Sequence, residues 1–279
     1  MHIHSHHSCD GAQATMKSIM DDRNTMGIEH FAVTDHLHSR YNISDIESSR
    51  HDFLGWNLPE NFHFGIEVSL IAQWECDRIA AGDFVARGDV PIYGFRDDER
   101  PFDGRICLDF TEDMCRKYGI EFVIGGVHWP LGYPETRTGV IENYFCQHIF
   151  LATHPLVDVV AHPWDSISLA AGDWYRHRDQ EHIDHTIYRE IPEDMHIALG
   201  KSILENGKLA EINFCNLEIP EYAADIMMKA FVQWRDMGVK FTCGSDQHGA
   251  FADMEYFRKM EALLEKYGLT RDDFALPFK

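Results

Sequence analysis

The chain has 279 residues, 44% of them hydrophobic and 12% aromatic, which is enough to bury one large core. Its 46 acidic and 25 basic residues give a formal net charge of −21. Such a chain repels nucleic acid and anionic membranes, so we expect neither a membrane partner nor an extended nucleic-acid surface. An anionic substrate would need local positive charge, supplied by metal ions or by a few arginines. The oligomeric state stays open.

Seven cysteines are scattered along the chain, and none of them forms a C-x-x-C pair. Their odd number argues against a complete set of disulfides. The chain shows no charged-then-apolar leader and no apolar run of about eighteen residues. We therefore expect a soluble, reduced, cytoplasmic protein in which most cysteines pack in the interior.

Short β-branched runs alternate with helical patterns along the whole chain. We expect strands at 2–4, 28–34, 62–66, 120–126, 157–161, 208–213 and 239–243, and helices near 12–26, 69–82, 109–118, 140–153, 192–206, 220–237 and 252–267. Pro220 opens one of these helices, and Gly238 closes it. This alternation predicts an α/β fold with a parallel sheet. About forty residues per unit, without a break in composition, favour a closed barrel as a single domain over residues 1–279.

Two segments read as long excursions from this pattern, 83–108 and 163–191. Long loops in compact domains are often functional, so both are candidate covers for a substrate.

The chain opens with a His-x-His pair, His2 and His4. If Ile3 lies in a strand, both imidazoles point to the same face and can bind one metal ion. The pair alone is weak evidence, because chance pairs and affinity tags look the same. Whether the pair belongs to a metal site depends on whether later strands supply further ligands.

Each predicted strand does deliver a potential metal ligand at or near its carboxyl end. In a parallel barrel these ends share one rim, which is where such barrels carry their active sites. The candidate ligands are His2, His4, Asp10, His36, Glu67, His128, His162, Asp246 and His248. Imidazoles and carboxylates without a thiolate suit zinc, iron or manganese. Nine ligands are too many for one ion, so we expect two or three divalent ions, with Glu67 as a bridge.

The motifs that carry this pattern are His-Ile-His-Ser-His-His-Ser-Cys-Asp (2–10), Val-Thr-Asp-His (33–36), Gly-Ile-Glu (65–67), Gly-Val-His (126–128), Ala-His-Pro (161–163), Glu-Ile-Asn (211–213) and Gly-Ser-Asp-Gln-His (244–248). In their order and spacing the chain resembles the PHP family, named for polymerase and histidinol phosphatase, and its histidinol phosphatase-like branch in particular. The resemblance implies a distorted (β/α)7 TIM-like barrel with up to three metal ions. It also implies hydrolysis of phosphoesters by a metal-bridged hydroxide.

Carried over motif by motif, the resemblance implies three ligand groups. The first metal would take His2, His4, Glu67 and Asp246; the second Glu67, His128 and His162; and the third Asp10, His36 and His248.

Further roles follow from position. Asp35 precedes a candidate ligand and is expected to orient a histidine or a metal-bound water, while Asp246 or His248 could pass a proton to the leaving alkoxide. The substrate-binding candidates are Arg40, Arg137, Arg176 and Asn213, which lie in loops beyond the rim strands or at a strand end. Arginine suits bidentate recognition of phosphate, although a solvated surface role is the alternative for each arginine.

We therefore expect a metal-dependent phosphatase acting on a small phosphomonoester, with L-histidinol phosphate as the leading specific substrate. A phosphodiesterase or nucleotide phosphatase of the same family is the nearest alternative. A catalytically weak binding or proofreading module is a further alternative. An amidohydrolase-like enzyme also opens with His-x-His but usually has a bridging lysine, and no lysine lies at the predicted rim.

Overall fold

The computed structural model describes residues 1–82, 103–132, 134, 136–172, 180–213, 219–249 and 254–278. Within these residues a seven-stranded sheet runs in the order β1-β3-β6-β7-β8-β9, with β2 also paired to β3. All of its pairings are parallel. Its strands are β1 (Phe31–Val33), β2 (His36–Leu37), β3 (Phe62–Ser69), β6 (Phe122–Gly126), β7 (Val159–Val160), β8 (Leu209–Asn213) and β9 (Lys240–Gly244).

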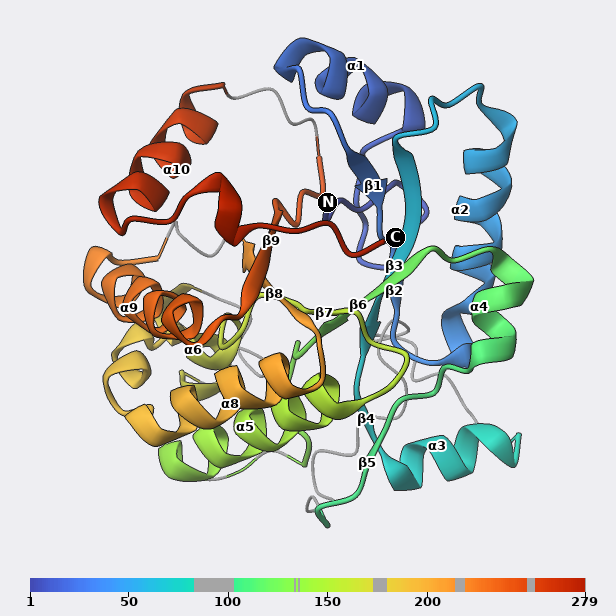
Figure 1. Cartoon of the computed structure of the whole chain (residues 1–279). Coiled ribbons are helices and arrows are strands. Elements are labelled where there is room, and N and C mark those ends of the chain that lie inside the picture. Colours follow the sequence, from blue (N-terminus) through green and yellow to red (C-terminus); the bar gives the residue numbers. More distant parts are fainter. Residues whose placement is uncertain are drawn as a thin grey trace.

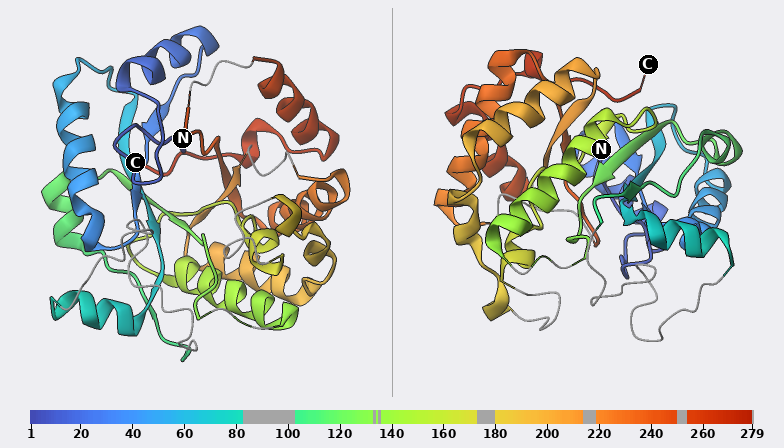
Figure 2. Two further views of the ribbon diagram at one scale, coloured as in Figure 1. Left: turned by 180° about the vertical axis from the view of Figure 1, so that it is seen from behind. Right: turned by 90° about the horizontal axis from the view of Figure 1, so that it is seen from below.

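Helices surround this sheet as an outer layer (Figures 1 and 2). They are α1 (Met16–Met26), α2 (Ile43–Gly55), α3 (Gln73–Ala80), α4 (Glu112–Tyr118), α5 (Arg137–Thr153), α6 (Ile167–Ala171), α8 (Glu193–Glu205), α9 (Glu221–Met237) and α10 (Met254–Lys266). Short 3-10 helices span 40–42, 180–182, 185–189 and 271–273. No helix in the described parts of the chain is long and apolar enough to span a membrane.

The helix ends follow from local sequence. Thr15 caps the start of α1 by accepting a hydrogen bond from the backbone nitrogen of Ser18. Pro220 precedes the first residue of α9, and Gly238 ends that helix with a φ of 104°, a conformation that favours glycine. The predicted start and stop of this helix are confirmed.

The sheet is buried on both faces, as expected for parallel strands covered by helices. All eight residues of β3 are buried. Inside the curl of the sheet Ala32, Phe122 and Ile124 form part of a small apolar cluster. The Phe122 ring packs so closely on Gly65 that a Cβ there would lie 2.7 Å from it.

The first residues of the chain join the two edge strands of the sheet. The backbone nitrogen of Thr34, just after β1, donates to the carbonyl of Ile3 at 2.8 Å, and His4 N donates to the carbonyl of Gln247 at 2.9 Å. The strand expected over 2–4 is therefore a single bridge at Ile3. It places His2 and His4 between β1 and β9.

The structure adds elements that the sequence pattern did not predict. Helix α2 lies between β2 and β3, and β4 (Ile71–Ala72) pairs antiparallel with β5 (Ile106–Cys107). Because β3 continues to Ser69, the helix expected from 69 begins at Gln73. Residues 83–102 of the first expected excursion, and 173–179 of the second, lie outside the described residues.

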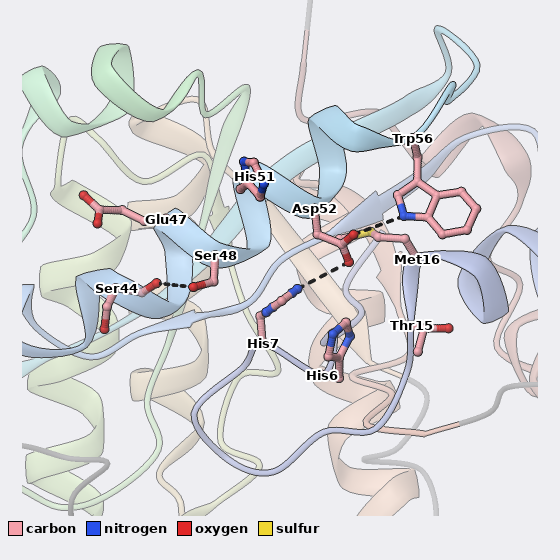
Figure 3. A pocket seen from close by; sticks show the side chains of 10 residues that line it. All are labelled: His6, His7, Thr15, Met16, Ser44, Glu47, Ser48, His51, Asp52 and Trp56. Carbon is pink, nitrogen blue, oxygen red and sulfur yellow. Dashed lines mark hydrogen bonds and ion pairs between the residues drawn. The ribbon is translucent and has the colours of Figure 1, made fainter.

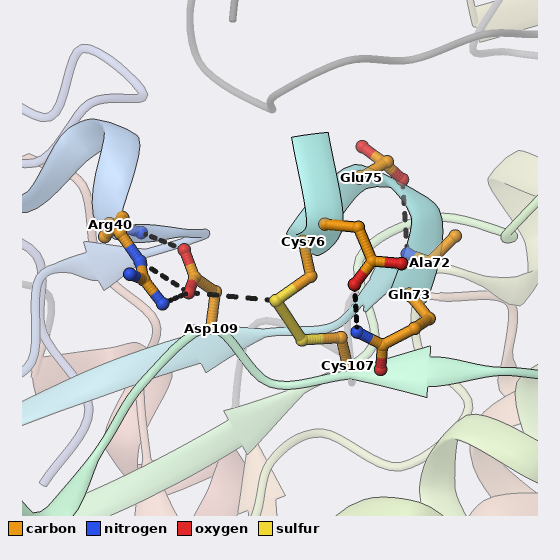
Figure 4. The surroundings of a disulfide bond; sticks show 8 residues. Arg40, Ala72, Gln73, Glu75, Cys76, Cys107 and Asp109 are labelled. Atoms are coloured by element: carbon orange, nitrogen blue, oxygen red, sulfur yellow. Dashed lines mark hydrogen bonds and ion pairs between the residues drawn. A yellow bond between two sulfur atoms is a disulfide. The ribbon is translucent and has the colours of Figure 1, made fainter. Parts of the chain in front are cut away.

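One cysteine pair differs from the expectation of a reduced chain. Cys76 of α3 and Cys107 of β5 form a disulfide, with their Cα atoms 6.4 Å apart (Figure 4). Four other described cysteines are free: Cys9, Cys115, Cys146 and Cys243.

Candidate metal centre

Glu67 lies near the carboxyl end of β3, and its side chain is fully buried. One carboxylate oxygen, Oε2, faces three imidazoles. It lies 3.0 Å from His2 Nε2, 3.0 Å from His36 Nδ1 and 3.5 Å from His4 Nε2. These histidines come from the first residues of the chain and from β2, so the parallel fold brings them to Glu67.

The other oxygen of Glu67 faces a second pair of imidazoles. Oε1 lies 2.8 Å from His162 Nε2 and 3.1 Å from His128 Nε2. Both histidines stand two residues beyond the ends of their strands, β7 and β6. One carboxylate thus separates two sets of nitrogen donors, which is the arrangement of a bridging ligand.

Asp246 completes the group that the sequence predicts for a first ion. Its Oδ1 lies 2.9 Å from His4 Nε2 and 3.5 Å from His2 Nε2, and these two nitrogens are 3.1 Å apart. Neighbouring ligands around a tetrahedral zinc ion with bonds of 2.0–2.1 Å lie about 3.3 Å apart. The donor atoms of His2, His4, Glu67 and Asp246 all lie within 4.8 Å of one another.

A third group stands beside the first. Asp10 Oδ2 lies 3.2 Å from His36 Nε2 and pairs closely with His248 Nε2. Together with His4 these residues form another set of donors within 4.8 Å of one another. The structure therefore brings all nine candidate ligands to one place, at the carboxyl ends of the strands.

Hydrogen bonds orient several of these imidazoles from behind. His2 Nδ1–H donates to Glu211 Oε1 at 2.9 Å, and His248 Nδ1–H donates to the carbonyl of Asp246 at 2.7 Å. His128 Nδ1 is hydrogen bonded to Ser69 Oγ at 2.7 Å. Such partners fix the ring and its tautomer, and they leave Nε2 directed at the centre.

Two of these orienting residues were not assigned that role from the sequence. These residues are Glu211 and Ser69. Ser69 stands two residues after Glu67, so the period of a strand places both on the same face. The position of Ser69 in its strand could therefore have indicated its role. The contact of Glu211 with His2 joins residues that are 209 positions apart, and it can be seen only in the folded structure.

The backbone is strained at the centre. His162 has a φ of 24° and Asp246 a φ of 52°, and with Trp164 at 69° they are the non-glycine residues with positive φ in the described chain. Side chains of L-residues disfavour this region, and residues held there cluster at functional sites. Two of the three are candidate ligands.

Charges at the centre are strongly coupled. Burial alone would raise the pKa of Glu67, but the surrounding imidazoles hold it well below its ordinary value. Burial alone would lower the pKa of His36 and of His162. The facing carboxylates, Glu67 above all, instead raise these pKa values to about 10 and about 9.

The residues fit divalent metal ions. Glu67 Oε2, Asp10 Oδ2 and His36 Nδ1 are buried and make no hydrogen bond of acceptable geometry, although each lies close to a donor or acceptor of opposite type. Buried charged atoms are costly unless they are paired with good hydrogen bonds or coordinate a metal, and a bound ion would supply the partner that these atoms lack. The nitrogen and oxygen donors suit zinc, manganese or iron.

Asp35 lies behind the first ligands. Its Oδ1 accepts a hydrogen bond from Ser5 N at 2.5 Å, and its Oδ2 accepts one from Ser5 Oγ at 2.7 Å. These contacts favour a role in positioning the segment that carries His4. The predicted catalytic role of Asp35 stays a prediction.

The predicted phosphate-binding arginines have other partners in the structure. Arg40 Nε donates to Asp109 Oδ1 at 2.8 Å, close to the disulfide (Figure 4). Arg137 pairs with Glu190, at 3.0 Å, and with Asp184. Among the described contacts neither arginine touches the nine candidate ligands.

Two substrate-binding predictions remain. Arg176 lies outside the described residues. Asn213 is buried at the end of β8, and its Nδ2 donates to Glu211 Oε2 at 3.2 Å. The structure thus places Asn213 against the carboxylate that orients His2, and its predicted contact with substrate stays a prediction.

Asp165 is a further acidic residue at the centre that sequence reasoning missed. Its backbone nitrogen donates to the carbonyl of His162 at 3.0 Å. Burial raises the pKa of Asp165 to about 7, against the opposing influence of His162. A carboxyl group with such a pKa can donate or accept a proton near neutral pH.

No family model and no curated protein matches the chain. Its fold is similar to that of the histidinol phosphate phosphatase from Lactococcus lactis subsp. lactis Il1403, whose crystal structure is of a complex with zinc, L-histidinol and phosphate. The TM-score is 0.58 at 16% sequence identity, over 96% of this chain and 93% of that chain. At this identity the likeness shows a shared fold, and it confirms the predicted α/β, TIM-like architecture.

Proposed function

We propose that this protein is a metal-dependent phosphoesterase of the PHP type that hydrolyses a small phosphomonoester. The observation that carries the proposal is the buried carboxylate of Glu67, which faces imidazoles with both oxygens. It lies at the carboxyl ends of parallel strands, the rim at which TIM-like barrels hold their active sites.

The three donor groups would hold two or three divalent ions. Glu67 would bridge the first two, and Asp10, His36 and His248 would hold the third. Zinc is the first choice, because the similar structure from Lactococcus was determined with zinc, and the donors also suit manganese and iron. Bound ions of this kind lower the pKa of water and neutralise charge on phosphoryl oxygens.

His248 and Asp246 are the proposed proton donors to the leaving alkoxide. The side chain of His248 is 42% exposed, against 19% for Asp246, so His248 is the more accessible to a substrate. Its Nδ1–H is held by the carbonyl of Asp246, so Nε2 would carry either a metal ion or the proton for the leaving group, and His248 could donate that proton only while Nε2 is not bound to metal.

The specific substrate we propose is L-histidinol phosphate. Support comes from the similar structure, which holds L-histidinol and phosphate. With a net charge of −21, this chain would draw the positive charge for a phosphate mainly from the bound ions. Arg40, Arg137, Arg176 and Asn213 stay proposed substrate contacts. A cytoplasmic location is likewise a proposal. The Cys76–Cys107 disulfide would be unusual there, because disulfides are rare in cytoplasmic proteins.

Two rival functions make different predictions. A phosphodiesterase or nucleotide phosphatase would cleave bis-p-nitrophenyl phosphate or nucleotides, whereas the proposed enzyme cleaves p-nitrophenyl phosphate and not the bis ester. A catalytically weak binding module would release no phosphate from any of them. The complete set of nine donors in one place favours an enzyme over such a module.

The test is a panel of phosphorylated metabolites that includes L-histidinol phosphate, assayed by phosphate release. Loss of the bridge in Glu67→Gln should lower turnover at least about 100-fold, because metal-assisted stabilisation of several kcal/mol depends on it. Glu205→Gln, the same change at an exposed position of α8, is the matched control. Unchanged turnover in Glu67→Gln would show that the bridge is not needed.

A further inference from the structure

A second group of histidines lies outside the metal centre, at the pocket drawn in Figure 3. The pocket has a volume of about 760 Å³ and lies between the loop after His4 and one face of α2. His6 and His7 come from the loop, and Ser48, Asp52 and Trp56 come from α2 and the residue that follows it.

Three side chains of this pocket converge as metal ligands do. Donor atoms of His6, His7 and Asp52 all lie within 4.8 Å of one another. His7 Nε2 lies 3.3 Å from Asp52 Oδ2, and the ring centroids of His6 and His7 are 4.0 Å apart. The first distance equals the separation of about 3.3 Å between two ligands of a tetrahedral zinc ion.

The carboxylate and the loop are both held in place. Trp56 Nε1 donates to Asp52 Oδ1 at 3.1 Å, which leaves Oδ2 directed at His7 (Figure 3). The backbone nitrogen of His7 donates to Ser5 Oγ at 3.2 Å, so the loop is anchored one residue after His4. Orienting partners of this kind are typical of metal ligands.

We propose that His6, His7 and Asp52 form a separate site for a single divalent transition-metal ion such as Zn²⁺. Two imidazoles and one carboxylate suit such an ion and disfavour Mg²⁺ or Ca²⁺, which prefer oxygen donors. A water molecule would complete the coordination of such an ion. The site lies on the loop that joins the candidate ligands His4 and Asp10, so a bound ion would fasten this loop to α2.

This proposal does not depend on the proposed phosphatase activity. The experiment titrates Zn²⁺ into the full-length protein whose metal centre is already filled, and follows the heat of binding. Wild-type protein should bind one ion beyond those of the centre. The double variant His6→Ala/His7→Ala and the single variant Asp52→Ala should lose that additional ion and keep the ions of the centre.

Three further variants sharpen the result. His51→Ala removes an imidazole that lines the same pocket but does not belong to the group, and it should keep the additional ion. Trp56→Phe removes the donor that orients Asp52 and should weaken binding on the order of 10- to 100-fold. Glu67→Ala should lose ions of the centre and keep the additional one, which separates this site from the proposed active site.

Circular dichroism and thermal unfolding check that each variant is folded, and anomalous scattering from zinc-soaked crystals locates the ion. The proposal is overturned if the folded double variant binds as many ions as wild type. It is also overturned if His51→Ala loses the additional ion as readily as the double variant does, since that result indicates unspecific binding to a histidine-rich surface.

Discussion

Glu211 holds the imidazole of His2 from behind, with 2.9 Å between its Oε1 and His2 Nδ1. Both side chains are fully buried. Because Nδ1 carries the proton that Glu211 accepts, Nε2 is the ring nitrogen that points toward Glu67, 3.0 Å away, and it is the one available to a metal ion. A carboxylate, an imidazole and a candidate metal position thus stand in line, which is a common support for metal-binding histidines.

This relationship predicts a graded effect of changes at Glu211. Glu211→Ala should weaken metal binding on the order of 10- to 100-fold, whereas Glu211→Gln should weaken it less because an amide oxygen can still accept the proton of His2. Competition with a chromophoric chelator measures the affinity. Equal affinity in wild type and Glu211→Ala would mean that His2 does not bind metal through this arrangement.

Metal uptake by the metal-free protein should release protons. The pKa values of His36 and His162, about 10 and about 9, leave both protonated near pH 7, and imidazoles must be neutral to bind metal. Metal affinity should therefore rise with pH until these values are passed. Calorimetry in buffers of different ionisation enthalpy counts the protons released. The Glu67→Gln variant should release fewer protons on binding metal, because it lacks the carboxylate that contributes most to both raised pKa values.

The same shifts predict how the stability of the metal-free protein depends on pH. A histidine has a pKa of about 6.5 in the unfolded chain. The raised pKa values of His162 and His36, about 9 and about 10, therefore stabilise the fold fully below a pH of about 6.5. Their contribution should be lost as the pH rises through 9 to 10. Urea unfolding across this range, after chelation, checks the sign; stability that rises over the same interval would contradict it.

Ser5 and Asp35 should behave as a coupled pair. Either Ser5→Ala or Asp35→Ala leaves a buried partner without its hydrogen bond, which typically costs about 1–3 kcal/mol. A double-mutant cycle by urea unfolding should show that the second change adds less than the first. Fully additive effects would indicate that the two side chains do not interact in solution.

Gly126 should tolerate no side chain. A Cβ there would overlap Glu67 Oε1 and lie 2.6 Å from His128 Cε1. Gly126→Ala is therefore expected to displace the bridging carboxylate and to lower the metal content by at least one ion. Gly55→Ala, at a position where a Cβ meets no atom within 4 Å, is the control. Mass spectrometry of total metal compares the two variants.

Much of the fold could be predicted because the strands are short, β-branched and regularly spaced. Strands β6, β8 and β9 lie within or close to their expected ranges. Helix α2 was missed because few of its residues face the core, with Ile46 and Ser49 its buried positions, so its sequence lacks a clear apolar stripe. A strand was expected over 2–4, where the structure has a single bridge at Ile3. The extent of pairing there could not be predicted, because it depends on residues more than thirty and more than two hundred positions away.

The candidate site could likewise be predicted only in part. The nine proposed ligands could be placed together because most of them stand at or just beyond a predicted strand end, and parallel strands bring such ends to one rim. The hydrogen-bond and ion-pair partners of the site residues could not be predicted in this way. Glu211 meets His2 only through the closure of the sheet, and the pairing of Arg137 with Asp184 and Glu190 depends on how α5 packs against a distant loop.

Phosphate release from L-histidinol phosphate and p-nitrophenyl phosphate, before and after chelation, tests the central claim most directly. The zinc-loaded protein should hydrolyse a phosphomonoester, lose this activity when stripped of metal, and regain it when reloaded. Hydrolysis that survives complete removal of the ions would contradict the account. So would a protein that binds two or more ions at the centre and hydrolyses no phosphomonoester.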